Sequence, residues 1–177
     1  MRLFVGLDLP SETRRLLALL GGGIPGARWV PAENYHLTLR FIGEVPRYQA
    51  EEIDLALAAL RVRPFALELA GVGTFAKGGR DTSLWVGVAR NPQLDHLAAK
   101  IETALQRTGL EPERRRFVPH VTLARLDNCP VEKLVGFVQV HNLFGAPPVA
   151  MDHFTLFSSQ RGKELAVYTP EVKYPLV

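Results

Sequence analysis

The order of hydrophobic and polar residues follows two different periods along the chain, and each period predicts one kind of element. Apolar residues at every second position predict β-strands at residues 2–7, 35–42, 65–72, 83–89, 121–125, 149–157 and 165–172. Apolar residues three or four positions apart predict helices at residues 10–20, 49–60, 91–108 and 131–138. Strands and helices therefore interleave over the whole length of 177 residues.

Glycine and proline residues mark the boundaries between these predicted elements. Gly21-Gly22-Gly23 ends the first helix, Pro64 ends the second, and Asn91 before Pro92 is typical of a helix N-terminus. The chain lacks the regular β-α-β spacing and the glycine fingerprint of a dinucleotide-binding fold, so an α+β fold with a largely antiparallel sheet is favoured. Because no low-complexity linker divides the chain, we expect one domain spanning residues 1–177.

Composition narrows the class of protein without identifying a function. A hydrophobic content of 47% is enough for the core of one domain, and no run approaches the roughly 18 apolar residues of a membrane span. Asp8 and Pro10 interrupt the apolar start where a signal peptide would continue, so we expect a cytoplasmic protein without membrane contact. The net charge of +3 is compatible with a polyanionic partner. The single cysteine, Cys129, excludes an intramolecular disulfide and a zinc site of paired cysteines.

A four-residue pattern, His-x-Thr-x with apolar residues at x, occurs three times, beginning at His36, His120 and His153. Five histidines and nine threonines would give about 0.25 His-x-Thr pairs by chance, so three copies are an excess. On a strand, residues i and i+2 share one face, so each copy presents one imidazole and one hydroxyl above two apolar residues. Threonine is common in strands and half-buried strands alternate by default, so strand patterning is the competing interpretation of any single copy.

Two such strands side by side would bring two imidazoles and two hydroxyls into one cleft, and phosphodiester cleavage requires these groups. A neutral histidine can take a proton from water while a protonated histidine gives one to the departing oxygen. Threonine hydroxyls can donate hydrogen bonds to phosphoryl oxygens. An imidazole titrates at roughly pH 6.5, so both protonation states are available near neutrality, and the chemistry needs no metal ion and no cofactor. The spacing of the three copies does not determine which two form the pair.

The residues around two of the copies extend the pattern. Three segments of the chain resemble parts of the 2H phosphoesterase superfamily. Its first strand is similar to Arg2-Leu3-Phe4-Val5-Gly6-Leu7, and its first signature is similar to Asn34-Tyr35-His36-Leu37-Thr38-Leu39-Arg40-Phe41-Ile42-Gly43-Glu44-Val45. Its second signature is similar to Pro119-His120-Val121-Thr122-Leu123-Ala124-Arg125. Within this superfamily the chain resembles, nearly from end to end, the RNA 2′,3′-cyclic phosphodiesterases, also called 2′-5′ RNA ligases. The resemblance implies two pseudo-symmetric lobes of mainly antiparallel sheet with flanking helices, each lobe presenting one motif to a central cleft.

The resemblance also implies roles for the histidines. It makes His36 the acid that protonates the leaving 3′ oxygen and His120 the base that activates water, with a 2′-phosphate as the product. The corresponding strand of the family supplies no catalytic histidine at the position of His153, so the third copy is assigned to strand patterning.

Substrate-binding residues follow from the same resemblance. Thr38 and Thr122 would hold phosphoryl oxygens, and Phe41 and Arg125, each five residues after its histidine, are further candidates. Strict alternation puts a residue at i+5 on the opposite face from its histidine, so Arg125 reaches the phosphate only if the strand ends or twists, and Phe41 is expected to face the core. Arg40, at i+4, is on the His36 face and is the alternative electrostatic group.

Charged and aromatic residues near the motifs leave two interpretations open. The run Glu113-Arg114-Arg115-Arg116-Phe117 precedes the second motif, where it either binds the RNA backbone or forms a solvated loop. Trp29, Tyr35 and Phe117 are either platforms for an RNA base or residues of the core.

The function that the sequence predicts is metal-independent hydrolysis of 2′,3′-cyclic phosphates, at RNA 3′ ends or on small cyclic nucleotides, by a monomer. One alternative is reversible 2′-5′ ligation of RNA by the same groups, and another is a non-catalytic module that binds RNA ends. A two-histidine metal hydrolase is a third, although the sequence shows no ligand spacing of the His-Glu-x-x-His type.

Overall fold

The computed structural model describes residues 1–163 and 165–177, which form ten strands, four α-helices and one short 3-10 helix. The strands are β1 (Arg2–Asp8), β2 (Ala27–Trp29), β3 (His36–Glu44), β4 (Phe65–Leu67), β5 (Leu69–Lys77), β6 (Arg80–Val88), β7 (His120–Leu126), β8 (Val149–Met151), β9 (His153–Arg161) and β10 (Ala166–Pro175). The helices are α1 (Ser11–Ala18), α2 (Arg47–Ala58), α3 (Pro92–Arg107), α4 (Val131–His141) and the 3-10 helix η1 (Ala32–Asn34).

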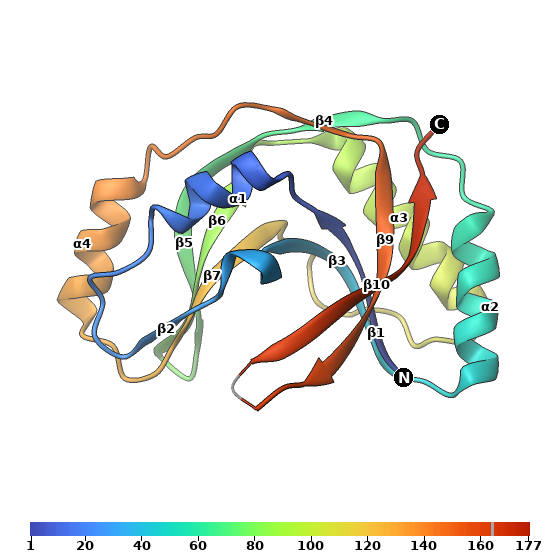
Figure 1. Ribbon diagram of the computed structural model, residues 1–177, viewed down its shortest axis with the longest axis horizontal. Coiled ribbons are helices and arrows are strands. Elements are labelled where there is room, and N and C mark those ends of the chain that lie inside the picture. The colour runs from blue at the N-terminus through green and yellow to red at the C-terminus, as the bar shows by residue number, and fades with distance from the viewer. Residues whose placement is uncertain (164) are drawn as a thin grey trace.

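Eight of the strands form one sheet in the order β10-β9-β1-β3-β7-β6-β5, with β2 paired to β7 outside this path. All strand pairs among the described residues are antiparallel. The strands from β10 to β3 form one lobe, and β7, β6, β5 and β2 form the other (Figure 1). The remaining strands, β4 and β8, make a separate two-stranded sheet. These features confirm the predicted α+β fold with two lobes of antiparallel sheet.

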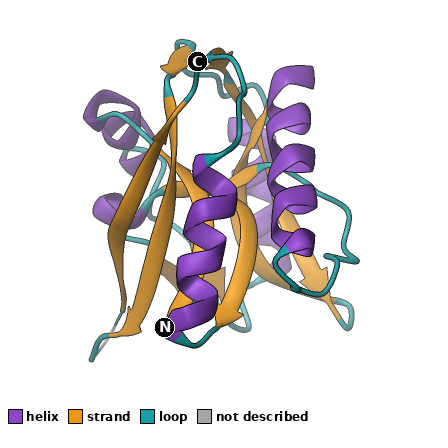
Figure 2. Ribbon diagram, turned by 90° about the vertical axis from the view of Figure 1, so that its right-hand side faces the viewer, coloured by secondary structure: helices purple, strands orange, loops and turns teal. Residues whose placement is uncertain are grey.

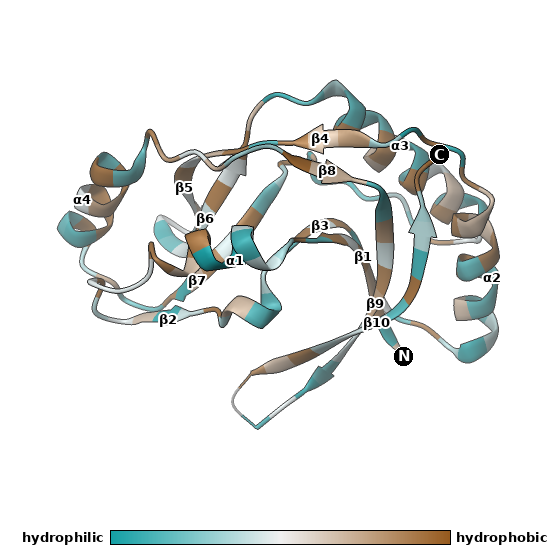
Figure 3. Cartoon of the chain, turned by 45° about the horizontal axis from the view of Figure 1, so that its top comes forward, coloured by the Kyte–Doolittle hydropathy of each residue, from teal (hydrophilic) through white to brown (hydrophobic). Residues whose placement is uncertain are grey.

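Helices flank both lobes. Seen from the side that carries α2, two helices stand beside each other against the strands, and these are α2 and α3, which are in contact (Figure 2). In the other lobe α4 contacts β5. The helices α1, α2 and α4 each carry both hydrophobic and hydrophilic residues, as amphipathic helices on a core do (Figure 3). No helix in the described part of the chain is long and apolar enough to cross a membrane.

The predicted start of α3 is confirmed by its cap. The side chain of Asn91 accepts a hydrogen bond from the backbone N–H of Leu94 at 3.0 Å, and Pro92 occupies the first turn. The first N–H groups of a helix have no acceptor inside the helix. The side chain of Asn91 accepts one of them, and Pro92 has no N–H group that would need an acceptor.

The two lobes meet where β3 and β7 run antiparallel, with Leu37 directly opposite Val121. Both side chains are fully buried, and the main hydrophobic core extends from them into both lobes. Burial of an aliphatic side chain contributes about 1.5–3 kcal/mol, so this pair holds the register of the two strands firmly. In this register His36 lies across from Thr122, and Thr38 lies across from His120.

Two of the predicted strands are each divided into two. The segment 65–72 contains β4, which pairs with β8, and the start of β5, which pairs with β6. The segment 149–157 contains β8 and the start of β9, which pairs with β1 and β10. A single polar residue, Glu68 or Asp152, separates the two strands in each case. In the first segment the period of two continues across Glu68, so the sequence pattern does not reveal the change of partner. In the second segment the buried positions shift by one residue across Asp152, from Met151 to Phe154.

Candidate active site

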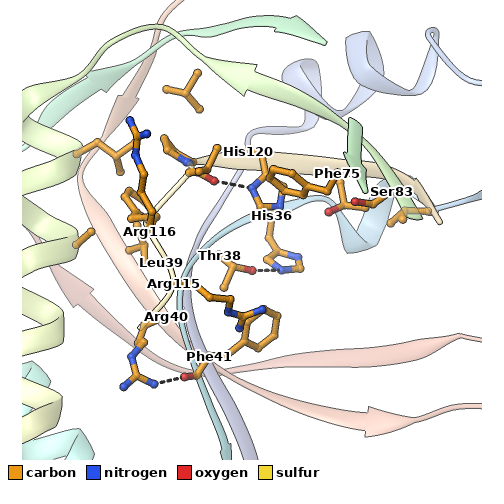
Figure 4. A pocket seen from close by; sticks show the side chains of 18 of the residues that line it. His36, Thr38, Leu39, Arg40, Phe41, Phe75, Ser83, Arg115, Arg116 and His120 are labelled. Atoms are coloured by element: carbon orange, nitrogen blue, oxygen red, sulfur yellow. Dashed lines mark hydrogen bonds between the residues drawn. The ribbon is translucent and has the colours of Figure 1, made fainter. Parts of the chain in front are cut away.

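The junction of β3 and β7 borders a cleft of about 1590 Å³. Its lining includes the polar residues of the first two motifs, which are His36, Thr38, His120 and Thr122. The apolar residues that alternate with them are buried, and these are Leu37, Leu39, Val121 and Leu123. The structure thus brings the two predicted histidines into one pocket, where Figure 4 shows them near each other.

His36 is held at both nitrogen atoms of its ring. Its Nδ1 lies 2.8 Å from the carbonyl oxygen of Asn34, and since a carbonyl oxygen can only accept, Nδ1 carries a hydrogen and donates it. Its Nε2 lies 2.9 Å from Oγ1 of Thr38. Nε2 is therefore the atom at which His36 gains or loses a proton, and it lies on the side of the motif threonine.

His120 has a matching arrangement in the other lobe. Its Nδ1 lies 2.6 Å from the carbonyl oxygen of Val118 and donates to it, so Nε2 is again the atom that exchanges a proton. Each motif histidine thus donates to the carbonyl group two residues before it. This bond fixes the tautomer and the orientation of both rings.

Aromatic side chains pack against both imidazoles. The ring of Phe4 lies 4.8 Å from that of His36, and Tyr168 makes an edge contact with the same ring at 5.0 Å. Phe75 lies perpendicular to His120 at 4.8 Å. Sequence reasoning missed these aromatic residues, because they come from other strands and no spacing links them to a histidine.

Burial is the main reason why the pKa of His36 and the pKa of His120 are both lower than the usual 6.5. At His36 the charge of His120 lowers the pKa further, followed by the charges of Arg125 and Arg14, and Arg125 also lowers the pKa of His120. The hydrogen bonds to the carbonyl groups of Asn34 and Val118 act in the opposite direction, because the charged ring is the stronger donor.

A β-bulge in β7 turns Arg125 toward the cleft. Thr122 and Ala124 pair with consecutive residues of β6, which makes Leu123 an extra residue in the strand. Leu123 and Ala124 are therefore both buried, and Arg125 returns to the exposed side and lines the cleft together with Thr122. Strict alternation predicted that Arg125 could reach the phosphate only if the strand ended or twisted before it, and this bulge provides that change.

A β-bulge in β3 likewise turns Phe41 away from the core, where alternation had placed it. Thr38 and Arg40 pair with the consecutive residues Gly6 and Val5 of β1, so that a second bulge falls in the first motif strand. The side chain of Phe41 is 50% exposed and lines the cleft, and the prediction that it faces the core is wrong. Alternation failed here because the bulge depends on pairing with β1, which the local pattern does not encode.

Arg40 is engaged in an ion pair away from the two histidines. Its Nε donates to Oε2 of Glu102 at 2.5 Å, its guanidinium also donates to the carbonyl oxygen of Glu111 at 2.5 Å, and its side chain is only 9% exposed. Burial alone would raise the pKa of Glu102, but the hydrogen bond from Arg40 and further hydrogen bonds lower it to about 2. Arg40 already has a carboxylate partner, which favours Arg125 as the phosphate-binding arginine.

The third His-x-Thr-x copy lies outside the cleft lining. Nε2 of His153 lies 2.9 Å from Oδ1 of Asp8, and its Nδ1 lies 2.6 Å from Oδ1 of Asp152. Thr155 is fully buried and contacts the same Asp8 oxygen at 3.3 Å. These contacts join β9 to β1, so the third copy is explained by packing within the sheet.

The remaining candidates divide between core and cleft. Tyr35 is only 4% exposed and belongs to the core, whereas Trp29 and Phe117 are half-buried and line the cleft. Arg115 and Arg116 of the basic run also line it. Among residues 1–163 and 165–177, no group of three histidine, cysteine, aspartate or glutamate side chains is arranged to hold a metal ion.

The two-lobed antiparallel fold and its cleft with two motif histidines define a two-histidine phosphoesterase. The family described as LigT like Phosphoesterase matches the chain twice, at residues 7–85 and 86–168. The chain belongs to this family. The first match contains His36 and the second contains His120, so each covers one of the two cleft histidines, which agrees with the pseudo-symmetry of the lobes.

Named relatives and solved structures agree with this assignment. The RNA 2′,3′-cyclic phosphodiesterase of Thermotoga maritima is 33% identical over 169 residues, which cover 90% of this chain and 87% of the relative. That of Aeropyrum pernix is 43% identical over 105 residues, which are only 59% of each chain. The crystal structure of Escherichia coli LigT complexed with 3′-AMP has a TM-score of 0.80 at 27% identity, covering 99% of this chain and 97% of LigT.

Proposed function

We propose that this protein hydrolyses the 2′,3′-cyclic phosphate at RNA 3′ ends. The relatives in T. maritima and A. pernix bear the name RNA 2′,3′-cyclic phosphodiesterase, and the structurally similar LigT has been crystallised with 3′-AMP. The observation that carries the proposal is the pair of histidines in one cleft, one from each lobe, with each Nδ1 fixed by a carbonyl group. This arrangement leaves both Nε2 atoms to exchange protons with the substrate.

The reaction follows from the opposite duties of the two histidines. Neutral His120 takes a proton from water as the water oxygen bonds to phosphorus, while protonated His36 gives its proton to the 3′ oxygen as the bond from phosphorus to that oxygen breaks. An in-line displacement needs the base and the acid on opposite sides of the phosphorus, and one histidine from each lobe meets this need. The products are a 2′-phosphomonoester and a free 3′ hydroxyl.

Four further residues hold the substrate. Thr38 and Thr122 donate hydrogen bonds to the non-bridging phosphoryl oxygens, and Arg125 balances their charge. The exposed ring of Phe41 offers a face on which the base of the terminal nucleotide can stack. All four residues line the cleft that contains the histidines.

The pH profile of kcat/KM is expected to be bell-shaped, with its maximum below pH 6.5. The fraction of protein with neutral His120 and protonated His36 is greatest between their two pKa values, and both values are lower than 6.5 in the free protein. Because Arg125 lowers both, Arg125→Gln should move both limbs of the profile to higher pH. Initial rates at low substrate concentration measure this, and a wild-type maximum above pH 6.5 would contradict it.

The direct test of the proposed function is turnover of 2′,3′-cyclic AMP with a metal chelator present, with 3′,5′-cyclic AMP as the matched substrate. We expect hydrolysis of the first compound alone, at a rate that the chelator does not change. Loss of activity in chelator that added metal restores would favour a metal hydrolase. Tight binding of cyclic-phosphate RNA without any turnover would favour a non-catalytic module.

Ligation of RNA through a 2′-5′ linkage is the second candidate function. It needs the same groups, with the 5′ hydroxyl of another RNA in the place of water. The cleft of about 1590 Å³ supports this function, because it is larger than a small-molecule site of roughly 300–1,000 Å³ and has room for a second RNA end. Rates of joining and of hydrolysis on one substrate separate the two functions. The cytoplasmic location and monomeric state expected from the sequence remain predictions.

A further inference from the structure

The loop that precedes β7 presents two arginines to the cleft. Arg115 and Arg116 line the same pocket as the two histidines (Figure 4). Arg90, two residues after the end of β6, also lines it. All four arginines are exposed, but Arg114 lies outside the lining. The basic run of the sequence is therefore divided by the fold, with its second and third arginines on the cleft side.

Hydrogen bonds hold this loop against the body of the protein at three points. Oε1 of Glu102 accepts the backbone N–H of Glu113 at 2.9 Å, and Arg40 donates to the carbonyl oxygen of Glu111 at 2.5 Å. At the far end, the carbonyl oxygen of Val118 accepts from His120. The loop is fixed on both sides of Arg115 and Arg116, so its backbone is ordered before a ligand binds. This order reduces the conformational entropy that the loop loses on binding.

The positive charge on this side of the cleft exceeds what one phosphate needs. The cyclic phosphate has Arg125 and the two motif threonines. Among the described residues, no carboxylate oxygen lies within 4.0 Å of the guanidinium of Arg90 or Arg116. Arg115 has only an exposed, 3.4 Å contact with Glu113, of the kind that contributes little in water.

The carboxylates that line the cleft neutralise the positive charge of these arginines only in part. They are Glu102, which is neutralised by Arg40, Glu113, which also accepts the backbone N–H of Arg115 at 3.1 Å, and Asp95. An anionic ligand with further phosphates would therefore find cations with little competition from within the protein.

We infer that the loop 111–119 forms a subsite for the RNA backbone, in which Arg115 and Arg116, with Arg90 beside them, bind phosphodiesters of single-stranded RNA. The inference rests on the proposed function. A cyclic phosphate occupies the 3′ end, so every other phosphate of the substrate lies on its 5′ side, and the subsite binds that part of the strand. The protein then prefers an oligonucleotide to a cyclic mononucleotide.

The test compares 2′,3′-cyclic AMP with a short oligoadenylate that ends in the same cyclic nucleotide, at several salt concentrations. Each phosphate bound by the subsite should steepen the fall of log kcat/KM with log salt by about 0.7 for the oligonucleotide alone. The double variant Arg115→Gln and Arg116→Gln should lower the ratio of oligonucleotide to mononucleotide kcat/KM by about tenfold and flatten the salt dependence. The double lysine variant, which keeps the charge, should keep most of that dependence.

Arg114→Gln is the matched control, because it removes the same charge from the same loop outside the cleft, and it should change neither substrate. Equal loss for both substrates in the double glutamine variant, or an equal effect of Arg114→Gln, would overturn the subsite. If wild-type protein hydrolyses neither substrate, the proposed function fails on its own. The salt dependence of oligonucleotide binding, measured by fluorescence anisotropy for the same variants, then still decides whether the subsite exists.

Discussion

Replacing His120 by alanine is expected to lower kcat for 2′,3′-cyclic AMP by about 10²- to 10⁴-fold, and His36→Ala is expected to have an effect of the same size. His120→Ala removes the group that takes the proton from water, and His36→Ala removes the group that protonates the leaving oxygen. The double variant should be little worse than either single variant, since the two groups act in one step and their effects do not add. Steady-state rates of the purified variants measure this.

Two other histidines supply the controls for this experiment. His153 carries the third copy of the motif but lies outside the cleft lining, and His96 is exposed on α3. His153→Ala and His96→Ala should each retain the wild-type rate, with thermal unfolding used to confirm that each variant is folded. A large loss in His153→Ala with unchanged unfolding, or near-normal turnover in His36→Ala, would mean that the wrong pair of copies has been chosen.

Replacing Thr38 or Thr122 by valine should lower kcat by about 10²- to 10³-fold, the usual effect of removing one fixed donor from a site of developing charge. Valine keeps the shape of the threonine side chain, so the loss reports the hydroxyl. KM should change less than kcat, because the phosphoryl oxygens gain charge in the transition state.

The matched control is threonine to serine at each position, which keeps the hydroxyl and should restore most of the rate. A valine variant that raises KM without lowering kcat would show that the hydroxyl binds the ground state and transition state equally. A serine variant as inactive as the valine variant would show that the methyl group, and therefore packing, is what the site needs.

Strand alternation predicted the part of the site that lies before each bulge. It placed His36 and Thr38 on one face above Leu37, and the structure has this arrangement. It failed for Phe41 and did not decide the side on which Arg125 lies, because a bulge reverses the faces of the residues that follow it and is set by pairing with a neighbouring strand. A pattern read along a single strand contains no information about such a pairing.

Contacts between distant residues were the other part that the sequence could not provide. Arg40 is 62 residues from Glu102, and its position at i+4 gave no sign that its guanidinium is already paired with that carboxylate. Tyr168 reaches His36 from β10, near the opposite end of the chain. Such contacts depend on how the lobes are assembled, whereas the motif and its extended signature are local and were readable before the fold was known.

The position of the phosphate in the product tests the account most directly. Phosphorus NMR of 2′,3′-cyclic AMP treated with the protein in chelator should show adenosine 2′-phosphate as the single product, because His36 protonates the 3′ oxygen and the bond from phosphorus to the 2′ oxygen remains. Adenosine 3′-phosphate, a mixture of the two isomers, or no product in chelator would contradict the account.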